Sequence, residues 1–212
     1  MRKVKEYWIV FAKPAAAAEP PAAKPWMLFY EWIDSVVGAI IVIFILFTFL
    51  FRPVGVDGTS MVPTLNDGDW VAISGINFQP RRGDIVVVTQ PNEVHEPLIK
   101  RIIAVGGDTI DIDFISHEVS VNGTVIEEPY ISEPTAMKFD VDFPKTIPAG
   151  FVFVMGDNRN NSKDSRATGI GLIDERYILG TTRFRLYPVN KFKIDYSRFN
   201  ITVRAPGTII MN

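Results

Sequence analysis

One uncharged apolar run limits what this chain can fold into more than any other feature. Residues 35–51 contain no charged side chain, and most of them are Val, Ile, Leu or Phe. A run of this length is at the short end of what the hydrocarbon core of a bilayer requires, and Tyr30 and Trp32 extend it with aromatic rings typical of membrane interfaces. The sequence therefore predicts a transmembrane anchor helix over residues 32–51.

Two other interpretations of the run are weaker. A helix buried in a protein core is disfavoured because no polar face interrupts the apolar residues. A cleaved signal peptide is disfavoured because a long segment precedes the run, and because the run ends in Phe51-Arg52-Pro53 rather than in small residues. We therefore expect the anchor to stay uncleaved.

The basic residues predict the orientation of this anchor. Those that precede the run are Arg2, Lys3, Lys5, Lys13 and Lys24. After the run, Arg52 is followed by no Lys or Arg until Arg81. Because basic residues favour the cytoplasmic side, residues 1–31, with their Pro/Ala-rich linker, should be cytoplasmic, and the chain from residue 52 onward extracytoplasmic. The predicted localisation is the cell membrane, with a single span and contact with membrane lipid.

Short β-like runs separated by turn residues follow the anchor. They occupy residues 70–73, 84–89, 98–105, 109–112, 119–121 and 151–154. The pair Asn122-Gly123 is a strong hairpin signal. No long helical period appears beyond the anchor, so we expect a mainly β fold, with an antiparallel sheet or partial barrel over residues 52–190. Within it, residues 108–147 form a small acidic β insert or solvated hairpin region, and residues 191–212 form a C-terminal extension.

The composition excludes several classes of function. The chain has no cysteine, which excludes disulfides, thiolate catalysis and cysteine-based metal sites. Its two histidines, His95 and His117, are poorly spaced for a metal site. A net charge of -2 provides no basic field for nucleic acid. We therefore expect no metal, no cofactor and no nucleic-acid partner.

Two short motifs place reactive side chains in unusual contexts. Ser60 lies at the centre of Gly58-Thr-Ser-Met-Val-Pro-Thr-Leu65, where glycine permits a close backbone approach and Pro63 fixes the chain. In the run 98–103, strand alternation puts Lys100 among apolar neighbours while Arg101 points to the other face. Burial lowers a lysine pKa, and a base working near neutral pH needs a fall from about 10.4 to between about 7 and 8.

A third motif, Gly156-Asp-Asn-Arg-Asn-Asn-Ser-Lys-Asp-Ser-Arg166, is almost wholly polar and follows a hydrophobic strand. Its mixed charges can form an ordered network in which Ser162 orients a neutral lysine and Asp164 with Arg166 braces the loop. Each motif taken alone also has an ordinary explanation: a turn serine, an edge lysine that reaches water, and a solvated loop.

Together these motifs resemble the type I signal peptidases, bacterial serine proteases of the Ser–Lys class. The resemblance covers the anchor to about Pro188 and keeps the order of four family boxes. These boxes are Ser60-Met-Val-Pro-Thr64, Arg82-Gly-Asp-Ile-Val-Val87, Lys100-Arg-Ile with Gly106-Gly-Asp108, and Gly156 to Arg166. The resemblance implies an endopeptidase that removes signal peptides from exported preproteins, which would be its partners as they emerge from the translocation machinery.

The resemblance also implies residue roles. Ser60 would be the nucleophile and Lys100 its base, with an acyl-enzyme intermediate. Ser162 would hold the lysine, and Asp164 and Arg166 would support it. The Ser60 N–H would be one oxyanion donor, whereas Gly58 stands where some members carry a serine that supplies the second, so the second donor is left open. An extended substrate would bind along residues 53–59 and 96–99.

Two other functions stay open at this point. One is a self-cleaving, repressor-type Ser–Lys protease, against which the anchor argues. The other is a catalytically dead binding module tethered to the membrane, against which the joint presence of Ser60, Lys100 and Ser162 argues. Cleavage of a preprotein by the wild-type chain, and its loss on substitution of Ser60 or Lys100, separates these possibilities.

Overall fold

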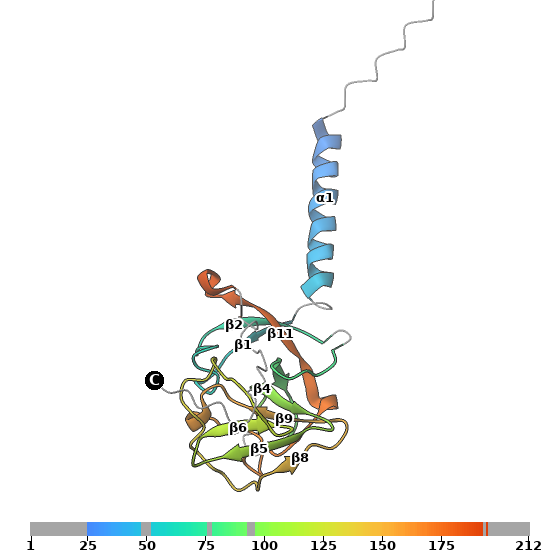
Figure 1. Ribbon diagram of the computed structural model, residues 1–212. Coiled ribbons are helices and arrows are strands. Elements are labelled where there is room, and N and C mark those ends of the chain that lie inside the picture. Colours follow the sequence, from blue (N-terminus) through green and yellow to red (C-terminus); the bar gives the residue numbers. More distant parts are fainter. Residues whose placement is uncertain (1–24, 48–51, 76–77, 93–95, 193, 195–212) are drawn as a thin grey trace, which may run out of the picture. The chain divides into compact units, whose positions relative to one another are not determined.

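The structure is a computed structural model that describes residues 25–47, 52–75, 78–92, 96–192 and 194 (Figure 1). The chain divides into two units, residues 1–42 and 43–212, which are described separately. The predicted Pro/Ala-rich linker, the last four residues of the predicted anchor and most of the predicted C-terminal extension lie outside the described residues.

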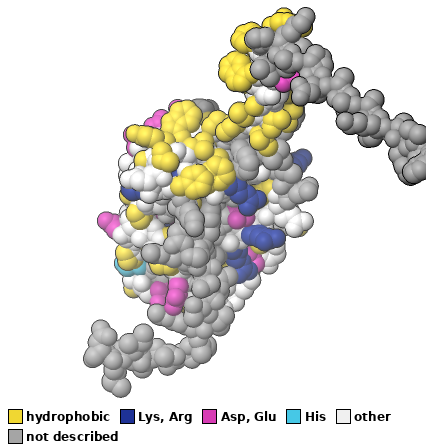
Figure 2. All heavy atoms as spheres, turned by 90° about the horizontal axis from the view of Figure 1, so that it is seen from above, with side chains coloured by type: hydrophobic (Ala, Val, Ile, Leu, Met, Phe, Trp, Pro, Cys, Tyr) yellow, Lys and Arg dark blue, Asp and Glu magenta, His cyan; other side chains and the backbone are white. Residues whose placement is uncertain are grey.

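The helix α1 spans Pro25–Ile45 and contains most of the predicted anchor. Proline suits the first helical position because its missing N–H has no partner there in any case. The apolar side chains of α1 are exposed, with Ile40 at 59% and Phe44 at 68%, and Figure 2 shows hydrophobic side chains gathered on this helix. In the part of the chain that the structure describes, no helix combines the length and apolarity that crossing a bilayer requires.

A seven-stranded antiparallel sheet forms the larger part of the second unit. Its order is β1-β2-β11-β3-β4-β9-β10. Its strands are β1 (Arg52–Gly55), β2 (Trp70–Ser74), β3 (Ile85–Val88), β4 (Leu98–Val105), β9 (Phe151–Met155), β10 (Ile173–Asp174) and β11 (Ile178–Tyr187). Three short 3-10 helices follow β9, β10 and β11, namely η2 (Arg159–Asn161), η3 (Glu175–Tyr177) and η4 (Val189–Lys191).

A second, four-stranded antiparallel sheet has the order β7-β6-β5-β8. Its strands are β5 (Thr109–Asp113), β6 (Glu118–Val121), β7 (Thr124–Val125) and β8 (Lys145–Thr146). The turn between β6 and β7 is the predicted hairpin, and both of its residues have positive φ, 54° at Asn122 and 75° at Gly123. A mainly β, antiparallel fold is thus confirmed.

Hydrophobic clusters attach the two sheets to each other and attach the loop between β1 and β2 (residues 56–69, the Ser60 loop) to the first sheet. Phe153 and Ile103 of the first sheet pack with Ile110 and Val121 of the second. Met61 and Leu65, on either side of a short turn after Ser60, pack against β2 and β3 in a separate cluster. The Ser60 loop is therefore held on the sheet by buried apolar side chains and not by its backbone alone.

The strand β11 was absent from the predicted runs, although it lies between β2 and β3 in the middle of the sheet. Its sequence is hard to interpret because register shifts between Thr182 and Phe184, and between Arg185 and Tyr187, break the alternation of side chains. Its end exposes Tyr187, and the following η4 exposes Val189.

Candidate active site

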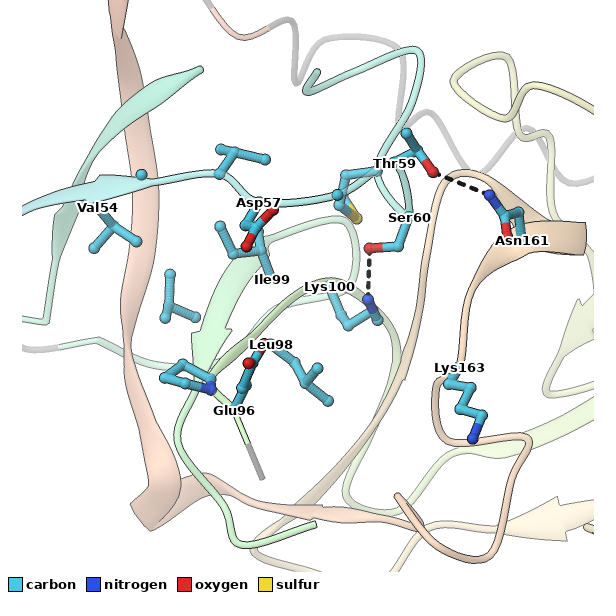
Figure 3. A pocket seen from close by; sticks show the side chains of 16 residues that line it. Val54, Asp57, Thr59, Ser60, Glu96, Leu98, Ile99, Lys100, Asn161 and Lys163 are labelled. Atoms are coloured by element: carbon cyan, nitrogen blue, oxygen red, sulfur yellow. Dashed lines mark hydrogen bonds between the residues drawn. The ribbon is translucent and has the colours of Figure 1, made fainter. Parts of the chain in front are cut away.

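Ser60 and Lys100 meet although they are far apart in the sequence. The Lys100 Nζ donates a hydrogen bond to the Ser60 Oγ at 2.7 Å (Figure 3). Ser60 lies in the turn between β1 and β2, whereas Lys100 lies on β4, an interior strand that pairs with β3 and, from Arg101 onward, with β9. The fold thus holds a flexible lysine side chain at one fixed place.

Lys100 is buried, with only 3% of its surface exposed. Its strand neighbours Leu98 and Ile102 pack into one hydrophobic cluster, and Ile103 packs into another, as the predicted alternation requires. Burial lowers the pKa of Lys100 from 10.5 to about 8, while the negative charges of Asp164 and Asp157 partly oppose this fall. A substantial fraction of the amine is therefore neutral at mildly alkaline pH.

Gly58 is explained within this chain by its backbone angle. No atom of the described chain lies within 4 Å of the position that a Cβ at Gly58 would take, so its own neighbours do not require glycine there. It is required by a φ of 85°, which side chains other than glycine rarely adopt. The Gly58 N–H donates to Asp67 Oδ1 at 2.9 Å, which occupies it, whereas the Ser60 N–H donates to no group among the described residues. Of these two amides, only that of Ser60 is available to an oxyanion.

The loop after β9 clamps the Ser60 loop from one side. Asn158 N–H donates to the Ser60 carbonyl at 3.0 Å, and the Asn158 side chain donates to the Thr59 carbonyl at 3.1 Å. Asn161 Nδ2 donates to Thr59 Oγ1 at 3.0 Å. A Cβ at Gly156 would lie 2.5 Å from the Ser60 carbonyl oxygen and 2.3 Å from Ser162 Oγ, so only glycine allows this approach.

The predicted bracing residues form a buried ion pair. Arg166 Nε donates to Asp164 Oδ1 at 2.8 Å, and both side chains are fully buried. Asp164 also accepts from the Gly156 N–H at 3.1 Å, which ties the pair to the glycine beside Ser60. Ser162 is 5% exposed, and its Oγ has no hydrogen-bond partner among the described residues. The structure thus leaves a buried hydroxyl unsatisfied beside the Ser60 loop, and the predicted orienting bond from Ser162 to Lys100 is not formed in it.

A second buried ion pair was missed by the sequence analysis. Arg101 forms two hydrogen bonds with Asp157, at 2.8 and 2.6 Å. The Arg101 guanidinium also lies 4.0 Å from the centre of the Tyr130 ring, and Thr64 Oγ1 donates to Asp157. The signal was present in the sequence, because Arg101 lies within an apolar strand and Asp157 follows another, and a lone charge is too costly to bury there.

A third pair joins Arg159 to Glu128, which lies in the segment between β7 and β8. Arg159 Nε donates to the Gly156 carbonyl at 3.0 Å, and its Nη1 donates to Thr135 Oγ1 at 2.8 Å. The segment that connects β7 to β8 of the second sheet therefore contributes to the support of the site. Nothing local in the sequence indicates this contact.

A pocket of about 650 Å³ opens beside the Ser60–Lys100 pair (Figure 3). The residues that line it come from four places: 54–61 at the end of β1 and after it, Val87 on β3, 96–100 at the start of β4, and Asn161 with Lys163 after β9. Both segments predicted to bind an extended substrate therefore border it. Among the described residues, no group of three His, Asp or Glu side chains is placed to hold a metal ion.

This geometry defines a class of chemistry. A neutral amine within hydrogen-bond distance of a hydroxyl can take its proton and turn the serine into a nucleophile. The adjacent free N–H can stabilise negative charge on a carbonyl oxygen, and the open pocket gives a polymer access. The site is thus suited to acyl transfer by serine.

Comparisons with known proteins agree with this class. The family model "Signal peptidase, peptidase S26" matches residues 29–187. A signal peptidase I of Bacillus licheniformis is 36% identical over 77% of this chain and 91% of its own. The signal peptidase I T of Bacillus subtilis is 36% identical over 82% and 94%, and the signal peptidase IB of Staphylococcus aureus is 36% identical over 80% and 95%.

A solved signal peptidase I from Enterococcus faecalis is 26% identical and aligns with 49% of this chain and 97% of its own, with a TM-score of 0.40. The chain belongs to the bacterial type I signal peptidases of the peptidase S26 family, which are serine endopeptidases.

Replacing Lys100 with Met should stabilise the folded chain. At pH 7 we expect the free energy of unfolding to rise by about 3 kcal/mol, because wild-type folding lowers the pKa of this lysine from 10.5 to about 8. Between pH 8 and 10.5 the unfolded wild type binds more protons than the folded wild type, so the wild-type free energy of unfolding increases with pH. The difference in free energy of unfolding between the variant and the wild type therefore shrinks over this range. Denaturant unfolding at pH 7, 9 and 11 measures this, with exposed Lys138→Met as the matched control. A less stable Lys100→Met variant at pH 7 would contradict the burial argument.

Proposed function

We propose that this chain is a membrane-anchored endopeptidase that removes signal peptides from exported preproteins, with Ser60 as nucleophile and Lys100 as base. The observation that carries the proposal is the 2.7 Å contact between Lys100 Nζ and Ser60 Oγ in a pocket open to a peptide. The substrate is inferred from the names of the relatives, which are signal peptidases.

In the first half of the proposed reaction, the neutral Lys100 Nζ takes the hydroxyl proton while Ser60 Oγ bonds to the carbonyl carbon before the cut. The resulting oxyanion accepts a hydrogen bond from the Ser60 N–H. The carbon–nitrogen bond then breaks, and the departing amine receives the proton from Nζ. The products of this half are a free mature protein and an ester between Ser60 and the signal peptide.

In the second half, a water molecule gives a proton to Lys100 Nζ and attacks the ester carbonyl. The carbon–oxygen bond to Ser60 breaks, and the proton returns from Nζ to Ser60 Oγ. The signal peptide leaves with a new carboxylate. In both halves we assign to the Ser162 hydroxyl the role of holding the amine once substrate is bound, although it forms no hydrogen bond to Lys100 in the described structure, and the Asp164–Arg166 pair braces the loop that carries it.

The substrate binds as an added strand in this proposal. Among the described residues, β1 pairs with β2 along one edge only, and β9 pairs with β4 only from Arg101 onward. Residues 54–57 and 96–99 therefore retain backbone groups that can pair with an extended peptide, and both segments line the pocket. Small residues before the cut fit a groove in which the backbone approaches closely.

The membrane anchor is the remaining part of the proposal. It rests on the exposed apolar side chains of α1 and on the uncharged run that continues beyond it to residue 51. The predominance of basic residues before the run supports a cytoplasmic N-terminus. The pocket then belongs to the extracytoplasmic side, where a translocated preprotein exposes its cleavage site.

Removing either reactive group should abolish cleavage. In detergent solution with a purified preprotein, we expect Ser60→Ala and Lys100→Ala to reduce kcat/KM at least about a thousand-fold. Ser120→Ala, which lies in the second sheet, serves as the matched control and should cleave like wild type. Circular dichroism verifies that each variant is folded. Wild-type rates in a folded Ser60→Ala variant would refute the assigned nucleophile.

The pH dependence should report the lysine directly. Because the active form carries a neutral amine, kcat/KM should rise with pH, about tenfold per unit below pH 8, and level off above it, in line with a Lys100 pKa of about 8. Initial rates of preprotein cleavage from pH 6 to 10 measure this profile. A flat profile, or one that rises only above pH 10, would exclude a buried neutral lysine as the base.

Anchoring should depend on the apolar run. The full chain should remain in the membrane pellet after alkaline carbonate extraction, whereas a variant with three Lys substitutions at Ile40, Val42 and Phe44 should be released, because charged side chains at the centre of a span cost several kcal/mol. Lys substitutions at three exposed residues of η3 and η4 provide the control. Equal retention of both variants would contradict the proposed anchor.

A further inference from the structure

The pocket beside Ser60 differs in polarity on its two sides. In Figure 3, Val54, Leu98 and Ile99 lie on one side of the Ser60–Lys100 pair, whereas Asn161 and Lys163 lie on the other. The first side is apolar where it borders the reactive pair and carries two exposed carboxylates, those of Asp57 and Glu96. The second side is polar and carries a positive charge.

Lys163 is the exposed member of a buried segment. Ser162 before it is 5% exposed, and Asp164, Ser165 and Arg166 after it are at most 1% exposed. The Asp164–Arg166 ion pair and the bond from Gly156 to Asp164 fix the backbone on which Lys163 stands. Among the described residues, Lys163 forms no ion pair and no hydrogen bond, although it lines the pocket. Its ammonium group is thus available to a ligand of opposite charge.

The two sides of the pocket correspond to the two halves of the substrate. Residues 54–57 and 96–99 each have one backbone edge that pairs with no strand among the described residues; these segments lie on the apolar side, and an extended peptide can pair with them there. The half that stays attached to Ser60 in the acyl-enzyme needs this pairing, because the other half must leave. The residues after the cut therefore pass over Asn161 and Lys163.

We propose that Lys163 is a specificity-determining residue that favours an acidic side chain among the first three residues after the cleaved bond. This inference rests on the proposed signal peptide cleavage and adds to it a preference on the leaving side. Asp57 and Glu96 disfavour acidic side chains on the other side of the cut, so the pocket selects a charge pattern and not merely a negative peptide.

The test uses the full-length chain in detergent and peptides that span one cleavage site. Each peptide is uncharged after the cut except for a single Glu, Gln or Lys at the first, second or third position. For the wild type, kcat/KM should be about two- to fivefold higher with Glu than with Gln at one of these positions, as for an exposed ion pair, and the ratio should fall at high salt. Lys163→Gln should bring the Glu/Gln ratio close to one. Lys163→Glu should bring it below one, and this variant should cleave the Lys peptide faster than the Glu peptide.

Lys191→Glu changes the same charge on η4, outside the pocket lining, and should keep the wild-type ratio. A Glu/Gln ratio that is the same in wild type, Lys163→Gln and Lys163→Glu at all three positions, with cleavage intact, would overturn this inference alone. Failure of the wild type to cleave any peptide or preprotein would overturn the proposed function and this inference with it.

Discussion

The contact between a buried amine and a hydroxyl is the constraint on which the rest of this structure depends. Lys100 must lose its hydration to be neutral near physiological pH, and it must still reach Ser60 Oγ at 2.7 Å. Both conditions are met by placing the lysine on β4, which is flanked by other strands, while Ser60 is brought to it on a loop anchored by Met61 and Leu65. The packing of the whole sheet offsets the free-energy cost of burying the amine.

The charged groups around this contact are arranged so that they do not raise the pKa of Lys100 back to its ordinary value. Two carboxylates near Lys100, those of Asp157 and Asp164, would raise its pKa strongly if they were unpaired. Each is instead bound by a buried arginine, Arg101 and Arg166 respectively, so its negative charge is largely compensated. The same pairs hold the loops that carry Gly156 and Ser162. Breaking one would leave a buried charge uncompensated, which makes these pairs positioning elements as well as structural ones.

Much of this arrangement could be predicted from the sequence, but only where the information is local. Alternation around Lys100, the Asn122-Gly123 turn and the short apolar runs are signals within a few residues, and the structure has the strands and the turn they indicate. The strand β11 was missed because its bulges disrupt the alternation, and the partner of Arg159 was missed because Glu128 is distant in the sequence. The positive φ of Gly58 was not predicted, since a backbone angle leaves no mark on the neighbouring residues.

The most direct test of the central claim is a site-specific titration of the Lys100 amine. The full-length chain, labelled with ¹³Cε and ¹⁵Nζ lysine in detergent micelles, gives one NMR signal per lysine, and the signal missing from a Lys100→Met sample identifies residue 100. Its chemical shift should follow a pKa of about 8, well below the ordinary lysine pKa of about 10.4. A Lys100 signal that titrates at 10 or above would show that the amine is charged at working pH and would contradict the account.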